Sequence, residues 1–238
     1  MNSSNNLLVR NTIIYALGDI LPKIFTFITF PVLTTYLTPA DYGIVNYVNT
    51  INTFLTILGF LSLNTYYLVF YFRVGDELEQ KKLLGNLSIF VIGFNFLFSL
   101  LACYLGYKFF DYIGNGIPFY PYIVIGLGIN FFNILPILPS ALYRVKENPM
   151  PLTILNVLKG FFIMVLTLIF VIYFKFSALG VLYSNLIVSF IFGVIFFFIT
   201  CKNAIWNLNW KQIKAALIFS LPLVPGSLAV SLYSIFDR

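Results

Sequence analysis

Long apolar segments separated by short polar breaks make up most of the chain. A helix needs roughly 20 apolar residues to cross the hydrocarbon core of a bilayer. The segments that meet this length are 12–37, 43–72, 85–107, 117–142, 151–174, 178–200 and 215–238. We therefore predict an all-α, polytopic membrane protein with six transmembrane helices in an N-terminal lobe plus an incomplete seventh. The longest segment, 43–72, is expected to tilt or to protrude from the membrane.

The last two predicted segments suggest a division into lobes. Residues 1–214 would form the first lobe, and residues 215–238 would begin a second one. Because the seventh segment stops on an acid–base pair at membrane depth, we expect the native protein to continue beyond it. Prolines inside the spans are expected to break or kink helices, and in transporters such breaks often line the pathway.

Two polar breaks could lie at the membrane surface. In the segment 203–214, Trp206 and Trp210 are one helical turn apart and lie close to Lys211. This pattern is typical of an interfacial helix in the headgroup layer. The break 73–84 carries both charge signs and is expected to be a solvated loop or a short interfacial helix.

The composition supports a membrane protein and gives its expected orientation. The chain is 60% hydrophobic and 9% charged, with mean hydropathy +0.94, whereas soluble domains carry about 25% charge. The net charge of +6 is scattered between apolar blocks, so no nucleic-acid partner is expected.

The basic residues also predict the orientation of the chain in the membrane. If the N-terminus is cytoplasmic, the cytoplasmic breaks contain Arg10, Arg73, Lys81, Lys82, Arg144, Lys146, Lys202, Lys211 and Lys214. The opposite breaks contain only Lys108 and Lys175. This excess predicts a multi-pass protein of the inner or plasma membrane with a cytoplasmic N-terminus.

Several kinds of chemistry have no motif in this sequence. The chain has no histidine, and its two cysteines, Cys103 and Cys201, fit no metal or redox spacing. A phosphate-binding GxxxxGK[ST] loop and the HExxH and GxSxG motifs are also absent. We therefore expect no catalytic residues, no metal and no cofactor, and we do not expect an enzyme.

Charged residues inside the apolar segments are the main candidates for function, since intramembrane charge is costly and usually functional. Asp19 and Lys23 lie on one face of the first helix. They could face a cavity, with Lys23 binding an anionic cargo and Asp19 holding it or titrating, or they could neutralise each other. Lys159 could face the same cavity or extend toward the headgroups. Arg144 is expected to anchor the cytoplasmic boundary.

A polar stripe on the second segment could line a wet cavity or pack against neighbouring helices. Its residues are Asn46, Asn49, Thr50, Thr53, Thr56 and Asn64. A cationic, polar cavity would attract a phosphate or pyrophosphate. We therefore predict a cavity that binds substrate through Lys23, Lys159, Arg238, Asn46, Asn49 and Thr53. Asp19 and Asp237 are the candidates for ion coupling or ion pairing.

Three stretches give the chain a resemblance to a known family. They are NTIIYALGDILPKIFTFITFPVLTTYLTPADYGIVNYVNT at 11–50, ALYRVKENPM at 141–150 and FSLPLVPGSLAVSLYSIFDR at 219–238. The chain resembles the polysaccharide flippases (Wzx-type, O-antigen and teichoic-acid exporters) of the multidrug/oligosaccharidyl-lipid/polysaccharide exporter superfamily. In that family two six-helix lobes flank a central cavity, so the resemblance implies the N-terminal half of such a transporter.

The resemblance also implies a cargo and partners. The expected activity is the flipping of undecaprenyl-pyrophosphate-linked oligosaccharide across the cytoplasmic membrane by alternating access. Membrane lipid and a polysaccharide polymerase or glycosyltransferase machinery are the expected partners. Two alternatives remain open at this point: a cation-coupled drug or organic-cation antiporter of the same superfamily, and a membrane enzyme of glycan assembly.

Overall fold

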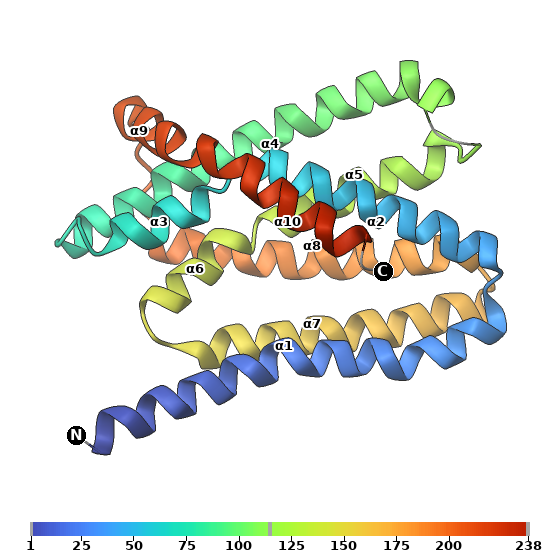
Figure 1. Ribbon diagram of the computed structural model, residues 1–238, viewed down its shortest axis with the longest axis horizontal. Coiled ribbons are helices and arrows are strands. Elements are labelled where there is room, and N and C mark those ends of the chain that lie inside the picture. The colour runs from blue at the N-terminus through green and yellow to red at the C-terminus, as the bar shows by residue number, and fades with distance from the viewer. Residues whose placement is uncertain (1, 114–115, 237–238) are drawn as a thin grey trace.

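The computed structural model describes residues 2–113 and 116–236, and this part of the chain folds as a helical bundle without strands (Figure 1). The α-helices are α1 (Asn2–Tyr36), α2 (Pro39–Phe60), α3 (Leu63–Tyr71), α4 (Glu77–Ile113), α5 (Val124–Ile134), α6 (Ile137–Val145), α7 (Pro149–Leu168), α8 (Ser177–Asn203), α9 (Trp210–Ser220) and α10 (Val224–Phe236). Two short π-helices (Phe119–Ile123, Ile169–Tyr173) and a 3-10 turn (Leu221–Leu223) complete the regular structure.

The expected membrane spans are present in this bundle. Six segments of the described chain are long and apolar enough to cross a membrane, and the bent pair α2–α3 would make a seventh. The prediction of an all-α, polytopic membrane protein is confirmed. Interior prolines have mixed effects: Pro136 and Pro222 lie at breaks, whereas α1 continues through Pro22 and Pro31.

The segment 43–72, predicted from the sequence as one long span, is broken into the two helices α2 and α3. Leu61 and Ser62 both adopt left-handed backbone conformations, and α3 leaves the axis of α2 at 46°. Such conformations are costly for residues other than glycine, so other contacts must stabilise them. The bend directs the buried face of α3, including Tyr66 and Tyr67, into an apolar cluster with α4 and α6.

The interfacial helix expected over 203–214 is not formed, because α8 ends at Asn203 and α9 begins only at Trp210. The segment 204–209 between them is non-helical and lies against α4. The Ile205 amide donates to the Lys81 carbonyl (3.0 Å), and the buried Asn86 side chain donates to the Asn209 carbonyl (3.1 Å). We call residues 204–209 the connector. Its last residue, Asn209, caps α9 by accepting from two backbone amides.

The charged break 73–84 is likewise mostly helical. Helix α4 begins at Glu77, and the ion pairs Glu77–Lys81 (2.8 Å) and Glu79–Lys82 (2.6 Å) lie on its first two turns. The acidic residues at this helix N-terminus are favoured by the helix dipole.

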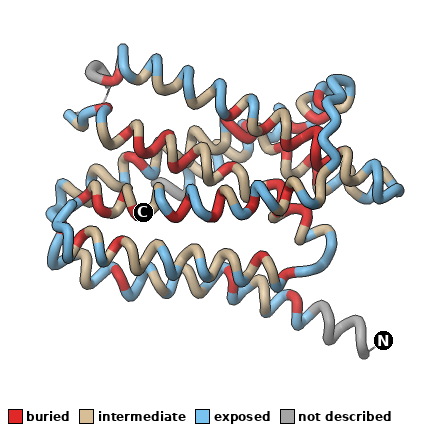
Figure 2. Tube along the Cα trace, turned by 180° about the vertical axis from the view of Figure 1, so that it is seen from behind, coloured by how far each residue is buried: buried red, intermediate tan, exposed pale blue. Residues whose placement is uncertain are grey.

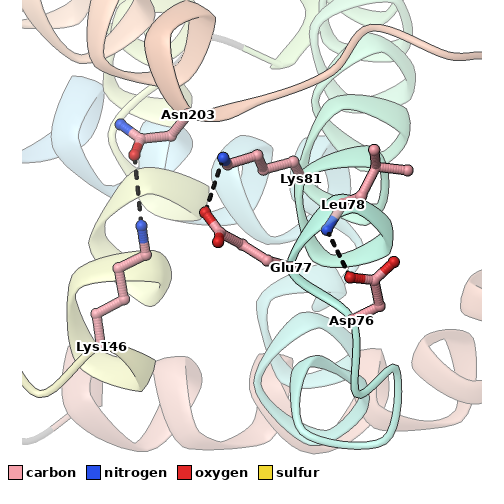
Figure 3. Close-up of polar contacts among 6 residues, drawn as sticks. All are labelled: Asp76, Glu77, Leu78, Lys81, Lys146 and Asn203. Atoms are coloured by element: carbon pink, nitrogen blue, oxygen red, sulfur yellow. Dashed lines mark hydrogen bonds and ion pairs between the residues drawn. The ribbon is translucent and has the colours of Figure 1, made fainter.

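The bundle gathers most basic breaks at one end, near the start of α1. There Lys146 at the end of α6 donates to Asn203 at the end of α8 (3.5 Å), and Lys81 of α4 approaches from the opposite side (Figure 3). We call this the basic end. Lys108 lies near the C-terminal end of α4, and Lys175 follows Tyr173, the last residue of the π-helix that continues α7, so both lie at the ends of these helices that are far from the basic end.

The helices pack in two unequal groups. Helix α1 lies along α7, whereas α2, α4, α5 and α8 form the main body, in which the buried residues concentrate (Figures 1 and 2). Gly160 permits the close approach of α1 to α7, because a Cβ at this position would lie 2.9 Å from the Pro22 Cβ. The space between the two groups is therefore bounded by α1 and α7 on one side and by α2 and α8 on the other.

The α1–α2 turn is held by Asp41, which binds two helix N-termini. Its Oδ2 accepts from the Thr38 amide (2.9 Å) and hydroxyl (2.7 Å), and the Thr38 hydroxyl accepts from the Asp41 amide (3.2 Å). Its Oδ1 accepts from the Ala178 amide at the start of α8 (3.3 Å). The carboxylate thus joins the α1–α2 turn to α8 at the end of the bundle opposite the basic end.

We expect Asp41→Ala to destabilise the protein by about 2 kcal/mol, since loss of a single helix cap already costs about 1 kcal/mol. Thermal unfolding of the full-length protein in detergent measures this loss. Asp41→Asn is the matched comparison: its single amide oxygen can keep only one of the two caps, because its NH2 group is a donor, so this variant should lose about half as much stability. Equal melting temperatures for Asp41→Ala and wild type would contradict the double cap.

Candidate functional site

A cavity of about 470 Å³ lies between the two groups of helices. Helices α1, α2, α7 and α8 all contribute to it. One part of its wall is apolar, with residues such as Leu33, Ile163 and Met164. Its polar residues are Thr26, Thr29, Tyr42, Asn46, Asn49, Thr167 and Asn185. This mixture of apolar wall and a few polar groups is typical of a ligand-binding cavity.

The hydroxyl groups of this cavity are partly bound to their own helices. Thr26 and Thr29 donate to the Pro22 and Phe25 carbonyls, at 3.1 and 2.6 Å. Their oxygens keep lone pairs that can accept from a ligand. The side chains of Asn46 and Asn49 form no hydrogen bond with other described residues and are exposed, so both amides are available to a ligand. The cavity can therefore both donate to and accept from a hydroxyl-rich molecule.

Lys159 lies on α7 next to Gly160, but unlike Gly160 it does not line the cavity. Its Nζ donates to the Asn133 Oδ1 on α5 (2.7 Å), and the Ser189 hydroxyl on α8 donates to the same oxygen (3.1 Å). The ammonium group is thus held inside the bundle and does not extend toward the headgroups. No carboxylate lies within ion-pair distance of it in the part of the chain that the structure describes. Its positive charge is therefore not compensated by a neighbouring protein charge.

The polar stripe on α2 serves both of the purposes considered for it. Asn46 and Asn49 line the cavity, whereas Thr56 accepts a hydrogen bond from Asn130 of α5 (2.7 Å). Thr53 donates to the Asn49 carbonyl (2.9 Å) and does not line the cavity. Asn64 lies beyond the bend, on α3.

The predicted Asp19–Lys23 pair is not formed. Both side chains are exposed, and no ion pair joins them within the described residues. Asp19 lines a smaller pocket beside Arg144, and Lys23 lines neither this pocket nor the large cavity. Asp237 and Arg238 lie outside the described residues.

Sequence reasoning missed the polar partners contributed by α5 and α8. Asn133 positions Lys159, and Asn185 lines the cavity. Both are polar residues inside apolar segments, which is the same signal that identified Lys159. Among the described residues, no group of three or more His, Cys, Asp or Glu side chains could hold a metal ion.

Comparisons with known proteins agree with this architecture. The sequence profile of a family described as "Polysaccharide biosynthesis protein" matches residues 8–238. No curated protein sequence matches the chain.

Several solved structures share the fold. The structure described as MATE in complex with MaD3S superimposes with a TM-score of 0.74 at 13% identity, covering 97% of this chain and 55% of that one. The bent form of the Vibrio cholerae MATE transporter VcmN gives 0.73 at 16% identity, covering 98% and 56%. An outward-facing multidrug resistance MATE family transporter of the MOP superfamily gives 0.69 at 14% identity, covering 97% and 54%. The chain spans about half the length of these transporters.

Proposed function

Because the chain belongs to the polysaccharide biosynthesis protein family and folds as a multi-pass membrane protein like the first half of a MOP-superfamily transporter, we propose that it exports a lipid-linked glycan. The cargo would be an undecaprenyl-pyrophosphate-linked oligosaccharide used for a cell-surface polysaccharide such as O-antigen or capsule. It would cross the inner or plasma membrane, with the basic end and the N-terminus in the cytoplasm, as the positive-inside rule predicts.

Transport in this proposal needs a second lobe. The described helices α1–α8 supply one wall of the pathway, and the cargo would move as the two lobes rock around it. The lipid tail would stay in the bilayer while the cavity shields the pyrophosphate and sugars. The released glycan would pass to a polysaccharide polymerase or glycosyltransferase machinery.

The amides and hydroxyls that line the cavity, together with the uncompensated Lys159 ammonium inside the bundle next to the cavity residue Gly160, support this cargo best. A pyrophosphate supplies the missing negative charge, and sugar hydroxyls match the asparagines and threonines. The family and the fold favour a transporter over an enzyme.

The test is reconstitution of the full-length protein in liposomes with labelled undecaprenyl-pyrophosphate oligosaccharide in one leaflet. The proposal expects the label to become accessible in the other leaflet. Label that stays in its starting leaflet, at a rate equal to protein-free liposomes, would contradict it.

The cavity amides make a separate prediction. Asn49→Leu removes a donor and an acceptor from the cavity, so we expect export to fall about tenfold, the size of one lost hydrogen bond. Thr53→Val is the matched control, because Thr53 lies one turn further along α2 and does not line the cavity. Export per molecule is compared after protein abundance is measured. Equal losses in both variants would count against a ligand contact at Asn49.

A second candidate function is suggested by the structural neighbours, one of which is described as a multidrug resistance transporter. The positive charge of Lys159, held inside the bundle next to the cavity residue Gly160, would repel an organic cation in the cavity. The Lys159 charge therefore separates the two functions experimentally.

A further inference from the structure

A second pocket, of about 220 Å³, lies between α1, α6 and α7 near the basic end. It shares no lining residue with the large cavity. Its lining residues include Tyr15, Gly18, Asp19, Arg144, Thr153 and Asn156. The pocket therefore combines one carboxylate, one guanidinium and uncharged polar groups.

The walls of this pocket are fixed by contacts between helices. Thr153 of α7 donates to the Ile14 carbonyl of α1 (3.0 Å), and a Cβ at Gly18 would lie 3.0 Å from the Thr153 hydroxyl. Tyr15 donates to the Tyr143 carbonyl (3.5 Å) at the end of α6. Helix α1 is thus held against α6 and α7 at the pocket, which fixes the backbone positions from which the Asp19 and Arg144 side chains extend.

Asp19 and Arg144 line the same pocket but do not neutralise each other. Neither takes part in an ion pair within the described residues, although both are exposed. A guanidinium binds phosphate oxygens with paired hydrogen bonds. A carboxylate can only accept, so it suits the hydroxyl donors of a sugar. Opposite charges that remain apart can hold a ligand that carries both an anion and hydroxyls.

We propose that this pocket binds the junction between the phosphate and the first sugar of the lipid-linked glycan. Arg144 binds the phosphate, and Asp19 and Asn156 bind hydroxyls of the sugar. The pocket is a loading site at the basic end, separate from the large cavity. This inference rests on the proposed function, since it specifies where the same cargo first binds.

The test measures lipid binding to the full-length protein by native mass spectrometry. The probes are undecaprenyl pyrophosphate and undecaprenyl-pyrophosphoryl-N-acetylglucosamine, with phosphatidylglycerol as competitor. Arg144→Gln should weaken binding of both probes by about tenfold, because it removes a charge-assisted contact to phosphate. Asp19→Asn should weaken only the probe with the sugar. Lys146→Gln is the matched control, since Lys146 lies at the same end but does not line the pocket.

Each result has a defined meaning. If wild-type protein binds neither probe, both the pocket assignment and the proposed function are overturned. The wild-type protein could bind both probes, and the two variants Arg144→Gln and Asp19→Asn could bind them as tightly as wild type does. That result would overturn only the pocket assignment. Displacement of the glycosylated probe by equimolar phosphatidylglycerol would assign the pocket to a phospholipid headgroup and overturn the glycan assignment. For Asp19→Asn, the measured quantity is the ratio of its affinities for the two probes within one protein preparation. This ratio remains informative even if Arg144→Gln fails to fold.

Discussion

Lys159→Glu is expected to lower glycan export at least about 100-fold, which corresponds to roughly 2.7 kcal/mol. The wild-type ammonium donates to the Asn133 Oδ1, whereas a carboxylate would place an acceptor against the same oxygen. A buried charge without a partner is strongly unfavourable. The new negative charge would also repel a pyrophosphate at the cavity. The measurement is the initial rate at which labelled lipid-linked glycan becomes accessible in the second leaflet.

Two further variants identify the cause of such a loss. Lys159→Gln keeps a donor for Asn133 but removes the charge, so a large loss in this variant would assign the effect to charge. Lys175→Glu reverses an exposed lysine at the end of the bundle opposite the basic end and should leave export unchanged. Export by Lys159→Gln at the wild-type rate would overturn the charge argument. If Lys159→Glu instead exports an organic cation faster than wild type does, the antiporter function is the correct one.

The sequence was sufficient for the number and order of the spans, because membrane crossing requires a length of apolar residues that is visible locally. The position of the α1–α2 turn also followed from the sequence, because it lies at the break between the predicted segments 12–37 and 43–72. Thr38, Pro39 and Asp41 there are typical helix N-terminal residues. The second hydrogen-bond contact of the Asp41 carboxylate could not be predicted from the sequence. Its donor is the backbone amide of Ala178, which comes from a distant part of the chain.

Features that depend on tertiary contacts could not be predicted. Leu61 and Ser62 have no sequence preference for left-handed backbone, and the bend at this point is stabilised by the burial of α3 side chains. The tryptophan spacing suggested a helix, but hydrogen bonds to α4 hold the connector in a non-helical conformation. Lys159 was identified as a buried charge. Its contact with Asn133, however, required knowing which helices are neighbours.

Gly85→Ala is expected to lower the stability of the protein by about 3 kcal/mol. A Cβ at this position of α4 would overlap the backbone carbonyl group of Ile205 in the connector. Backbone atoms cannot move aside as the end of a flexible side chain can, and overpacking of this kind costs about 1–3 kcal/mol. Displacement of the connector would also leave the buried Asn86 amide without the Asn209 carbonyl, a further loss of about 1–3 kcal/mol.

Gly93→Ala provides the matched control in the same helix. No atom lies within 4 Å of a Cβ at Gly93, and alanine is favoured over glycine inside a helix by about 0.5–1 kcal/mol. In detergent, the melting temperature of the full-length protein should fall by about 10 °C for Gly85→Ala and stay constant or rise for Gly93→Ala. The connector leads directly into α9, so its displacement should also loosen the packing of α9 and α10 against the other helices. Faster proteolysis at Ile205–Asn209 in Gly85→Ala alone would show this loosening. Equal melting temperatures and equal proteolysis in both variants would mean that α4 does not hold the connector.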